Sequence, residues 1–277
     1  MALGARTRFP VLLALALPVL SGLGYLHFAG APSRYLAING GALVLGLTAA
    51  FFVSQPAGVQ KRRALAILLL AGLFVPLISG PAIDGVARWI PIGPFTLHTA
   101  GLLLPALLVL ALGDREYGPP LLLAAVLAGL LQPDAAIGFV IFFACAGHHD
   151  VTRDWRIGLV CILAFIAALI MATRGNPAPQ QFVERLLVEA AGVSLALAAG
   201  LFLSLLASFF LVLRIIPAPK ATRYALAGSL FGFTVLSIMA NYPGVLIGYG
   251  AAPILGFGLA LGLSCKSSPE PRSVHGD

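Results

Sequence analysis

The chain has 277 residues, of which 60% are hydrophobic and only 10% are charged. A soluble domain would carry about a quarter charged residues, so this composition excludes a soluble globular protein and indicates one that crosses a membrane several times. The net charge of +7 does not indicate a nucleic-acid-binding surface, because basic residues in short loops of a membrane protein normally report its orientation. We expect membrane lipids as partners and no nucleic acid.

Ten apolar segments follow one another along the chain, and Pro, Gly or charged residues bound each of them. They predict an all-α polytopic fold with about ten transmembrane helices in one integral membrane domain over residues 1–265, followed by a short polar cytoplasmic tail over residues 266–277. The fifth and sixth segments are short, so they must be tilted, re-entrant or covered by other helices. The expected spans are 9–28, 36–54, 64–82, 97–113, 119–132, 135–148, 157–173, 190–213, 222–240 and 245–264.

The distribution of Lys and Arg between these spans predicts the orientation of the chain. With the N-terminus in the cytoplasm, the outer segments hold 4 of the 17 Lys and Arg residues and the inner segments hold the other 13. The positive-inside rule therefore favours ten spans with both termini in the cytoplasm, because one span more or fewer would scramble the alternation. The outer residues are Arg34, Arg88, Arg174 and Arg185.

Two motifs on the inner loops have ordinary explanations. Lys61–Arg63 is a positive-inside anchor that could also touch anionic lipid headgroups. His148–Asp150 contains metal-binding residue types, but adjacent residues rarely reach one ion together, so a solvated helix end is favoured. We expect no metal site and no cofactor, although a chain this hydrophobic would show little trace of a bound quinone or carotenoid.

One carboxylate, Asp134, lies in the middle of an otherwise uncharged run from Pro119 to Gly147. A charge in hydrocarbon is costly and is rarely kept there without a partner or a task. Because Pro133 cannot continue a helix interior, Asp134 either breaks a membrane helix at depth or occupies a turn between two short spans. The loop charges place this position on the outer side of the membrane.

The outer loop after the third span contains Arg88 and Trp89. An indole prefers the headgroup boundary, and a guanidinium binds phosphate or carboxylate groups with two hydrogen bonds. Spacing alone favours an interfacial anchor together with a structural ion pair from Arg88 to Asp84 or Asp134.

The outer segment after the seventh span has apolar and acidic residues at helical spacing. Phe182, Leu186 and Glu189 recur at i, i+4 and i+7, which predicts an amphipathic helical lead-in to the eighth span. Glu189 would lie just inside the membrane boundary, where it either pairs with a cation such as Arg88 or reaches water at the helix end.

Four motifs, in chain order, resemble those of the SEDS family, the shape, elongation, division and sporulation proteins of the FtsW, RodA and SpoVE type. The resemblance implies a shortened and divergent member with ten spans in the bacterial inner (cytoplasmic) membrane. It further implies peptidoglycan glycosyltransferase activity, in which lipid II is polymerised together with a class B penicillin-binding protein. The motifs are Arg88-Trp89-Ile90 with Gly93 and Phe95, Leu130–Asp134, Phe182–Gly192 and Gly248–Ala252.

The chain departs from the family pattern at several polar positions. The long outer loop between spans seven and eight is reduced to a few residues, and Gln181 matches the position of the family's catalytic Asp. An amide cannot take a proton from a sugar hydroxyl, so Glu184, Asp134 or Glu189 would have to replace that base. Other family polar residues are replaced by His98-Thr99-Ala100-Gly101, a residue near Leu104, and Ala190, and both serines of the last motif are lost.

A cluster of polar residues remains on the predicted outer side. The favoured interpretation is an ion-pair network that pins three broken helices, with Asp134 paired to Arg88. The alternative is a site for a lipid-linked pyrophosphate in which Arg88 clamps the anion. Fold alone does not decide between them. The cluster comprises Arg88, Trp89, Gln132, Asp134 and Glu189.

Three functions from different classes are compatible with these observations. The favoured one is a non-catalytic binding or scaffold subunit of a membrane complex, which docks helices of a penicillin-binding-protein-type or other partner through small residues. The alternative is a lipid II polymerase in cell-wall synthesis, cell division or cell shape. The third is a lipid flippase or transporter, because broken helices with a charged midpoint suit transport. The small residues are Gly40, Gly41, Gly46, Gly256, Gly258 and Gly262.

Overall fold

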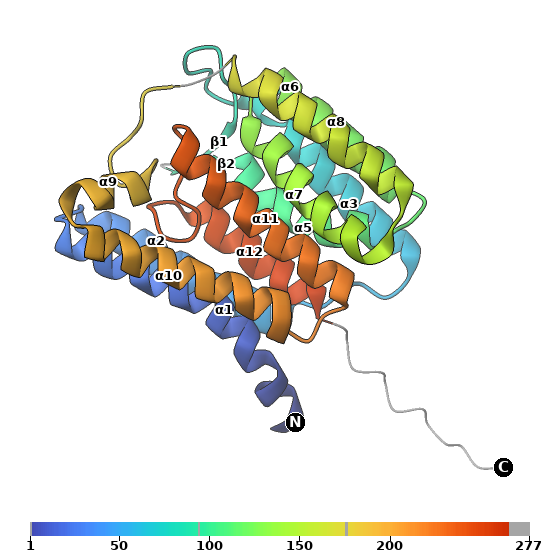
Figure 1. Cartoon of the computed structure of the whole chain (residues 1–277), viewed down its shortest axis with the longest axis horizontal. Helices are drawn as coiled ribbons and strands as arrows, with labels where there is room; N and C mark the ends of the chain where they lie inside the picture. The colour runs from blue at the N-terminus through green and yellow to red at the C-terminus, as the bar shows by residue number, and fades with distance from the viewer. Residues whose placement is uncertain (1, 94, 175–176, 266–277) are drawn as a thin grey trace.

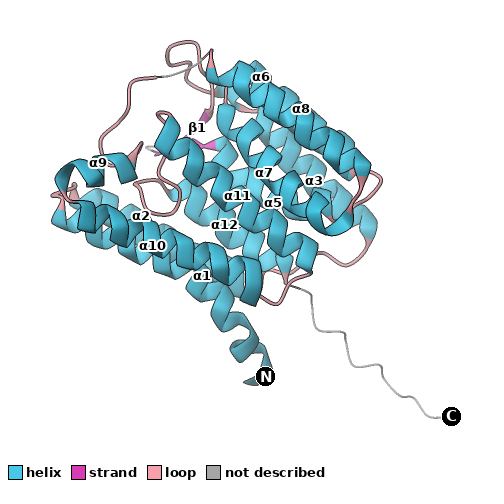
Figure 2. Ribbon diagram, viewed as in Figure 1, coloured by secondary structure: helices cyan, strands magenta, loops and turns pink. Residues whose placement is uncertain are grey.

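The computed structural model describes residues 2–93, 95–174 and 177–265, so the predicted tail over residues 266–277 lies outside the described residues. Helices make up most of the described chain, and one short hairpin of two strands is present (Figure 2). The elements are α1 (Ala2–Phe28), α2 (Ser33–Phe52), α3 (Val59–Phe74), α4 (Pro76–Ser79), β1 (Trp89–Ile92), β2 (Phe95–His98), α5 (Thr99–Leu112), α6 (Gly118–Leu131), α7 (Ala135–Thr152), α8 (Trp155–Ala172), α9 (Leu186–Val193), α10 (Leu195–Phe210), the π-helical turn η1 (Leu211–Ile215), α11 (Lys220–Met239) and α12 (Ala251–Ser264).

The helices are arranged in three groups (Figure 1). On one side α1 packs against α2 and α10, and on the other side α3, α6 and α8 lie together. Between these groups lie α5, α7, α11 and α12, where α11 packs on α7 and α12 packs on both α2 and α5. The hairpin lies at one end of this bundle, at the start of α5, and the connections from α2 to α3 and from α5 to α6 lie at the opposite end.

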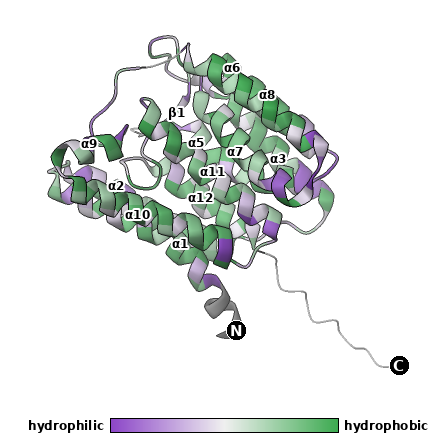
Figure 3. Ribbon diagram, in the orientation of Figure 1, coloured by the Kyte–Doolittle hydropathy of each residue, from purple (hydrophilic) through white to green (hydrophobic). Residues whose placement is uncertain are grey.

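The length and composition of the helices confirm an all-α polytopic membrane protein. Seven helices in the described residues are long and apolar enough to cross a bilayer. Three further apolar helices, α5, α6 and α12, have 14 residues each. Hydrophobic residues cover the lengths of the helices, and hydrophilic residues gather at helix ends and loops (Figure 3). Ten spans with two cytoplasmic termini stay a prediction.

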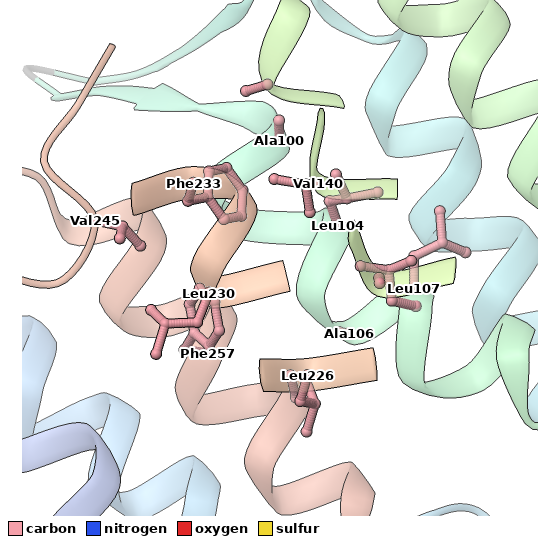
Figure 4. Close-up of a cluster of buried hydrophobic side chains, with 14 of the residues drawn as sticks. Ala100, Leu104, Ala106, Leu107, Val140, Leu226, Leu230, Phe233, Val245 and Phe257 are labelled. Atoms are coloured by element: carbon pink, nitrogen blue, oxygen red, sulfur yellow. The ribbon is translucent and has the colours of Figure 1, made fainter. Parts of the chain in front are cut away.

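Aliphatic and aromatic side chains fill the space between the central helices (Figure 4). Leu104 and Leu107 of α5, Leu230 of α11 and Phe257 of α12 belong to this cluster, and all four are buried. Helix α12 also approaches its neighbours through glycine, because a Cβ on Gly256 would collide with the backbone of α5. Helices without side chains at a crossing can pack backbone to backbone, as is common in membrane bundles.

Three local features differ from the sequence expectations. The fourth span was expected from residue 97, but a hairpin occupies this position, with Trp89 opposite His98, and α5 begins only at Thr99. The eighth span is broken, because Ser194 has an extended backbone between α9 and α10. The expected lead-in helix from Phe182 is also wrong: Phe182 has a φ of 67°, and the helix begins at Leu186. The turn at Phe182 instead serves the site described below.

The four glycines of α2 and α12 that were expected to dock a partner are used inside the bundle. Gly46, Gly256, Gly258 and Gly262 each face backbone or side-chain atoms of a neighbouring element of the same chain. Only Gly40 and Gly41 of that set have open space where a Cβ would lie.

Candidate functional site

Five irregular segments meet at the hairpin end of the bundle and bring together buried polar side chains. Arg88 precedes β1, His98 ends β2 and caps α5, and Asp134 lies in the break between α6 and α7. Glu184 belongs to the turn before α9, and Tyr242 follows α11. Each of these five side chains is at least nine-tenths buried, although they come from distant parts of the chain.

Arg88 is fully buried, and none of its side-chain nitrogens has a hydrogen-bond partner among the described residues. Its guanidinium carbon lies 4.7 Å from the ring centroid of Trp89 and 4.3 Å from that of Tyr242. A terminal nitrogen lies 4.0 Å from Oε1 of Glu184. Two aromatic faces and one carboxylate therefore balance the charge, while the N–H groups, which could bind an anion with two hydrogen bonds, stay uncommitted.

Asp134 uses its two carboxylate oxygens for different tasks. Oδ1 accepts a hydrogen bond from the backbone N–H of Ala136 at 3.1 Å and so caps the start of α7. Oδ2 lies 3.3 Å from Nε2 of His98. Nδ1 of His98 accepts the backbone N–H of Gly101, which leaves the ring proton on Nε2, facing Asp134. The carboxylate thus links the starts of α5 and α7.

Two neighbouring contacts fix the break between α6 and α7. Gln132 is buried, and its side-chain amide donates a hydrogen bond to the carbonyl oxygen of Leu73 at the end of α3. The hydroxyl oxygen of Tyr242 accepts the backbone N–H of Ala135 at 2.8 Å. The break is therefore tied to α3 and to the segment that follows α11, and it holds Asp134 in one position.

Glu184 lies in a turn that is tied down on both sides. Its backbone pairs with Pro243, and its Oε2 accepts the backbone N–H of Gln180 at 3.1 Å. Burial raises the pKa of Glu184, and the hydrogen bond from Gln180 and the charge of Arg88 oppose that rise. The charged form of Glu184 is therefore destabilised, and a second anion nearby would destabilise it further.

A cavity of about 160 Å³ opens beside these groups. The hairpin, the 180–184 turn and the start of α12 form its walls. Asn39 fixes the wall at the start of α12. Its amide nitrogen donates to the carbonyl oxygen of Gly248, and its amide oxygen accepts the N–H of Gly250. The polar side chains that line the cavity are those of Thr96, His98, Gln180, Glu184 and Tyr249.

Comparison with solved structures identifies the architecture. The chain is similar to the rod shape determining protein RodA of Thermus thermophilus with a TM-score of 0.63 and 18% identity, covering 91% of this chain and 93% of that one. A point variant of that RodA gives a TM-score of 0.66 and 19% identity over 91% and 94% of the two chains. A structure described as showing structural coordination of polymerization and crosslinking by a peptidoglycan synthase complex gives 0.60 and 22% over 91% and 95%.

The protein has a SEDS-type fold. Comparisons with protein-family models and with curated proteins find no match. The fold likeness therefore confirms the SEDS resemblance that the motifs predicted, at an identity where sequence comparison alone finds nothing.

Within the SEDS-type fold, the predicted cluster assembles in part and with different partners. Arg88, Trp89, Gln132 and Asp134 all lie at the hairpin end, as expected. The direct pair between Asp134 and Arg88 is wrong, because no contact within 4.0 Å joins them among the described residues: Asp134 contacts His98, and Arg88 contacts Glu184.

Glu189 contacts neither Arg88 nor Asp134 within the described parts of the chain. Its Oε2 accepts the backbone N–H of Phe182 at 3.3 Å, so it closes the turn that precedes α9. Gln181 is exposed and does not line the cavity, whereas its neighbour Gln180 does. The position matched to the family's catalytic Asp therefore carries an amide that lies outside the cavity.

Sequence reasoning missed the site roles of His98 and Tyr242. His98 was noted only as part of a replaced motif, although it is the polar residue that opens an apolar run. Tyr242 precedes Pro243 at the interruption between the last two apolar segments, which is the available signal.

Elsewhere, the described residues contain no group of three or more His, Cys, Asp or Glu that could hold a metal ion. At the end of α7, Asp150 pairs with Arg153.

Proposed function

We propose that this protein is a multi-pass SEDS-type subunit of bacterial cell-wall synthesis in the cytoplasmic membrane, and that it acts by binding rather than by catalysis. The observation that carries the proposal is the likeness to RodA over 91% of the chain, combined with an amide at Gln181 outside the cavity. The shared fold suggests a shared membrane setting, and the altered polar residues suggest a changed task.

The ligand that suits the outer site is a lipid-linked pyrophosphate. Arg88 is fully buried against Trp89 and Glu184, which line the cavity, and its N–H groups have no hydrogen-bond acceptor in the described chain. Pyrophosphate oxygens fit a guanidinium with two parallel bonds. Burial makes such a bond stronger than it would be in water. An anion at Arg88 would also repel Glu184, whose raised pKa already disfavours its charge.

The carboxylates near the cavity support binding without catalysis. Asp134 is fully buried and holds both Ala136 and His98. Glu184 is 4% exposed and holds the N–H of Gln180 while facing Arg88. A general base must reach the proton that it removes, and Asp134 does not line the cavity, while one oxygen of Glu184 is already bonded to Gln180.

A partner in the membrane is part of this proposal. One structurally similar chain comes from a peptidoglycan synthase complex, so a penicillin-binding-protein-type subunit is the first partner to test. Gly40 and Gly41 of α2, where a Cβ would meet no atom within 4 Å, would let a partner helix approach closely.

The test uses the full chain in mild detergent, with labelled lipid II and a penicillin-binding-protein-type partner. We expect saturable binding of lipid II, weakened about tenfold or more by Arg88→Gln, because a charge-assisted bidentate contact is lost. We expect no polymer in the same reactions. Asp84→Asn serves as the control, because this substitution removes one exposed charge at the same end of the bundle. Polymer formation would refute the non-catalytic part, and absence of binding would refute the ligand.

A second candidate, lipid II polymerisation with Glu184 as the base, is favoured by one observation. Glu184 lines the cavity and has a raised pKa, as general bases often do. Polymer that forms with the unaltered chain and disappears with Glu184→Gln, while lipid II binding persists, would establish it in place of the binding function.

A further inference from the structure

A second cavity lies at the end of the bundle opposite the hairpin. Its volume is about 270 Å³, and the start of α3, the end of α5 and the loop from α5 to α6 enclose it. Ala66, Leu110 and Leu121 form an apolar part of its wall, and Arg62, Arg63 and Arg115 form a basic part. Such a wall suits an amphiphilic ligand with a negative head.

Arg63 is already committed to the fold. It contacts Asp114 through two nitrogens, at 2.6 and 3.2 Å, and Glu116 at 2.8 Å. Its guanidinium also lies 3.8 Å from the ring centroid of Tyr117. Asp114 in turn accepts the backbone N–H groups of Glu116 and Tyr117. These contacts fix the loop, and they pair both carboxylates of the cavity wall, Asp114 and Glu116, with Arg63.

Arg62 and Arg115 differ from Arg63, because neither has a carboxylate within 4.0 Å among the described residues. The contact that Arg62 does make is a long hydrogen bond of 3.5 Å to the side chain of Gln55, which also lines the cavity. Helix α3 begins after Gly58 without a side-chain cap, so its first N–H groups add partial positive charge on the same side. The net field of this wall therefore favours an anion.

We propose that this cavity binds the phosphate group of an anionic phospholipid, with Arg62 and Arg115 as its ligands and the apolar wall against the glycerol and upper acyl chain. The site at the hairpin end differs from this one, because there the arginine has a carboxylate at 4.0 Å, whereas the two arginines here have none within that distance among the described residues. Arginine and lysine residues clustered at the membrane surface attract anionic lipids, and each contributes about fivefold in affinity. The apolar wall favours a lipid over free phosphate.

The experiment measures lipid binding to the purified full chain by native mass spectrometry, with phosphatidylglycerol, phosphatidylcholine and inorganic phosphate as separate probes. The test variant is Arg62→Gln with Arg115→Gln. The matched control is Arg153→Gln with Lys220→Gln, which removes two charges from exposed residues at the inner helix ends. Thermal unfolding of both variants verifies that each folds.

We expect phosphatidylglycerol to bind in preference to phosphatidylcholine, and the test variant to lose about tenfold or more of that preference. The control should stay within about twofold of the unaltered chain. Equal losses in both variants would mean that general surface charge, rather than this cavity, attracts the lipid. Unchanged binding in the test variant, or inorganic phosphate binding as tightly as the lipid, would overturn the proposal.

Discussion

The two ends of the bundle each hold an arginine and a carboxylate, yet the pairs differ in geometry and surroundings. At the end that holds the loop between α5 and α6, Arg63 contacts Asp114 through two nitrogens, and both side chains are partly exposed. At the hairpin end, Arg88 stays 4.0 Å from Glu184, and both are buried. Water can replace the partners of the first pair if they separate, but it does so far less readily at the buried pair. The same residue types therefore fix a loop at one end of the bundle. At the other end they leave an arginine without hydrogen-bond partners among the described residues.

The pKa values of the two carboxylates shift in opposite directions. The hydrogen bonds from Arg63 lower the pKa of Asp114 to about 2, whereas burial raises the pKa of Glu184. The carboxylate of Asp114 is therefore stabilised as an anion, and the carboxylate of Glu184 is destabilised. Direct hydrogen bonds from an arginine lower the first pKa, and burial without such bonds from its arginine raises the second.

The largest expected effect concerns Asp134. Asp134→Ala removes the cap of α7 and leaves His98 without its buried partner, so we expect a loss of about 3–5 kcal/mol, seen as a fall of about 10 °C or more in Tm in mild detergent. Asp84→Asn is the control, because it removes an exposed charge at the same end. A variant that folds and assembles like the unaltered chain would show that Asp134 serves activity rather than structure.

A smaller effect is expected when the pair of Arg88 and Glu184 is separated. Arg88→Met leaves Glu184 buried without its cation, while Glu184→Gln removes the carboxylate charge itself. The double variant should therefore cost less than the sum of the single variants, with a coupling of about 1–3 kcal/mol from denaturant unfolding. Additive losses would mean that 4.0 Å is too long for a coupled pair.

The pH dependence of Glu184 gives a third test. Its folded-state pKa is raised above the ordinary value of 4.5, so its contribution to stability is fully present below that pH and is lost as pH rises through the folded-state pKa. The stability of the unaltered chain relative to Glu184→Gln should therefore decline with rising pH above about 4.5. A stability difference that grows with pH in this range would contradict the assigned direction.

The smallest effect is expected at the pair of Arg63 and Asp114. Asp114→Asn should lower Tm by less than about 2 °C near neutral pH, because partly exposed ion pairs contribute little. The pKa of Asp114 is lowered in the folded state to about 2, so its contribution is present above its ordinary value and is lost as pH falls toward about 2. Comparison with Glu184→Gln should give opposite slopes. A large loss at neutral pH would erase the distinction between the two ends.

The positions of the apolar segments were predictable because a helix that crosses hydrocarbon must be apolar and about 20 residues long. Each of the ten expected spans overlaps a helix of the structure. The break at Ser194 was not predictable, because neither its neighbours nor its own residue type interrupts hydropathy. The hairpin before α5 was also missed, since Trp89–His98 is short and its apolar residues merge with those of the fourth span.

At the site, residue identity was easier to predict than pairing. Asp134 was expected to be important because an isolated charge in an apolar run is costly, and it is fully buried. Its partner could not be predicted, because His98 lies 36 positions earlier on an unexpected hairpin. Glu189 was expected in the cluster from helical spacing, but the turn at Phe182 is not helical. Partner choice in this region depends on irregular backbone, which hydropathy does not describe.

The three 14-residue helices have a consequence for the shape of the membrane surface. Each is about 21 Å long, against about 30 Å of hydrocarbon, so none fills the bilayer alone. At the hairpin end, α5 starts at Thr99, α6 ends at Leu131 and α12 starts at Ala251. The polar groups at this end therefore lie at the ends of helices that are shorter than the hydrocarbon layer. For the proposed lipid-linked ligand, we expect entry sideways from the bilayer rather than through water.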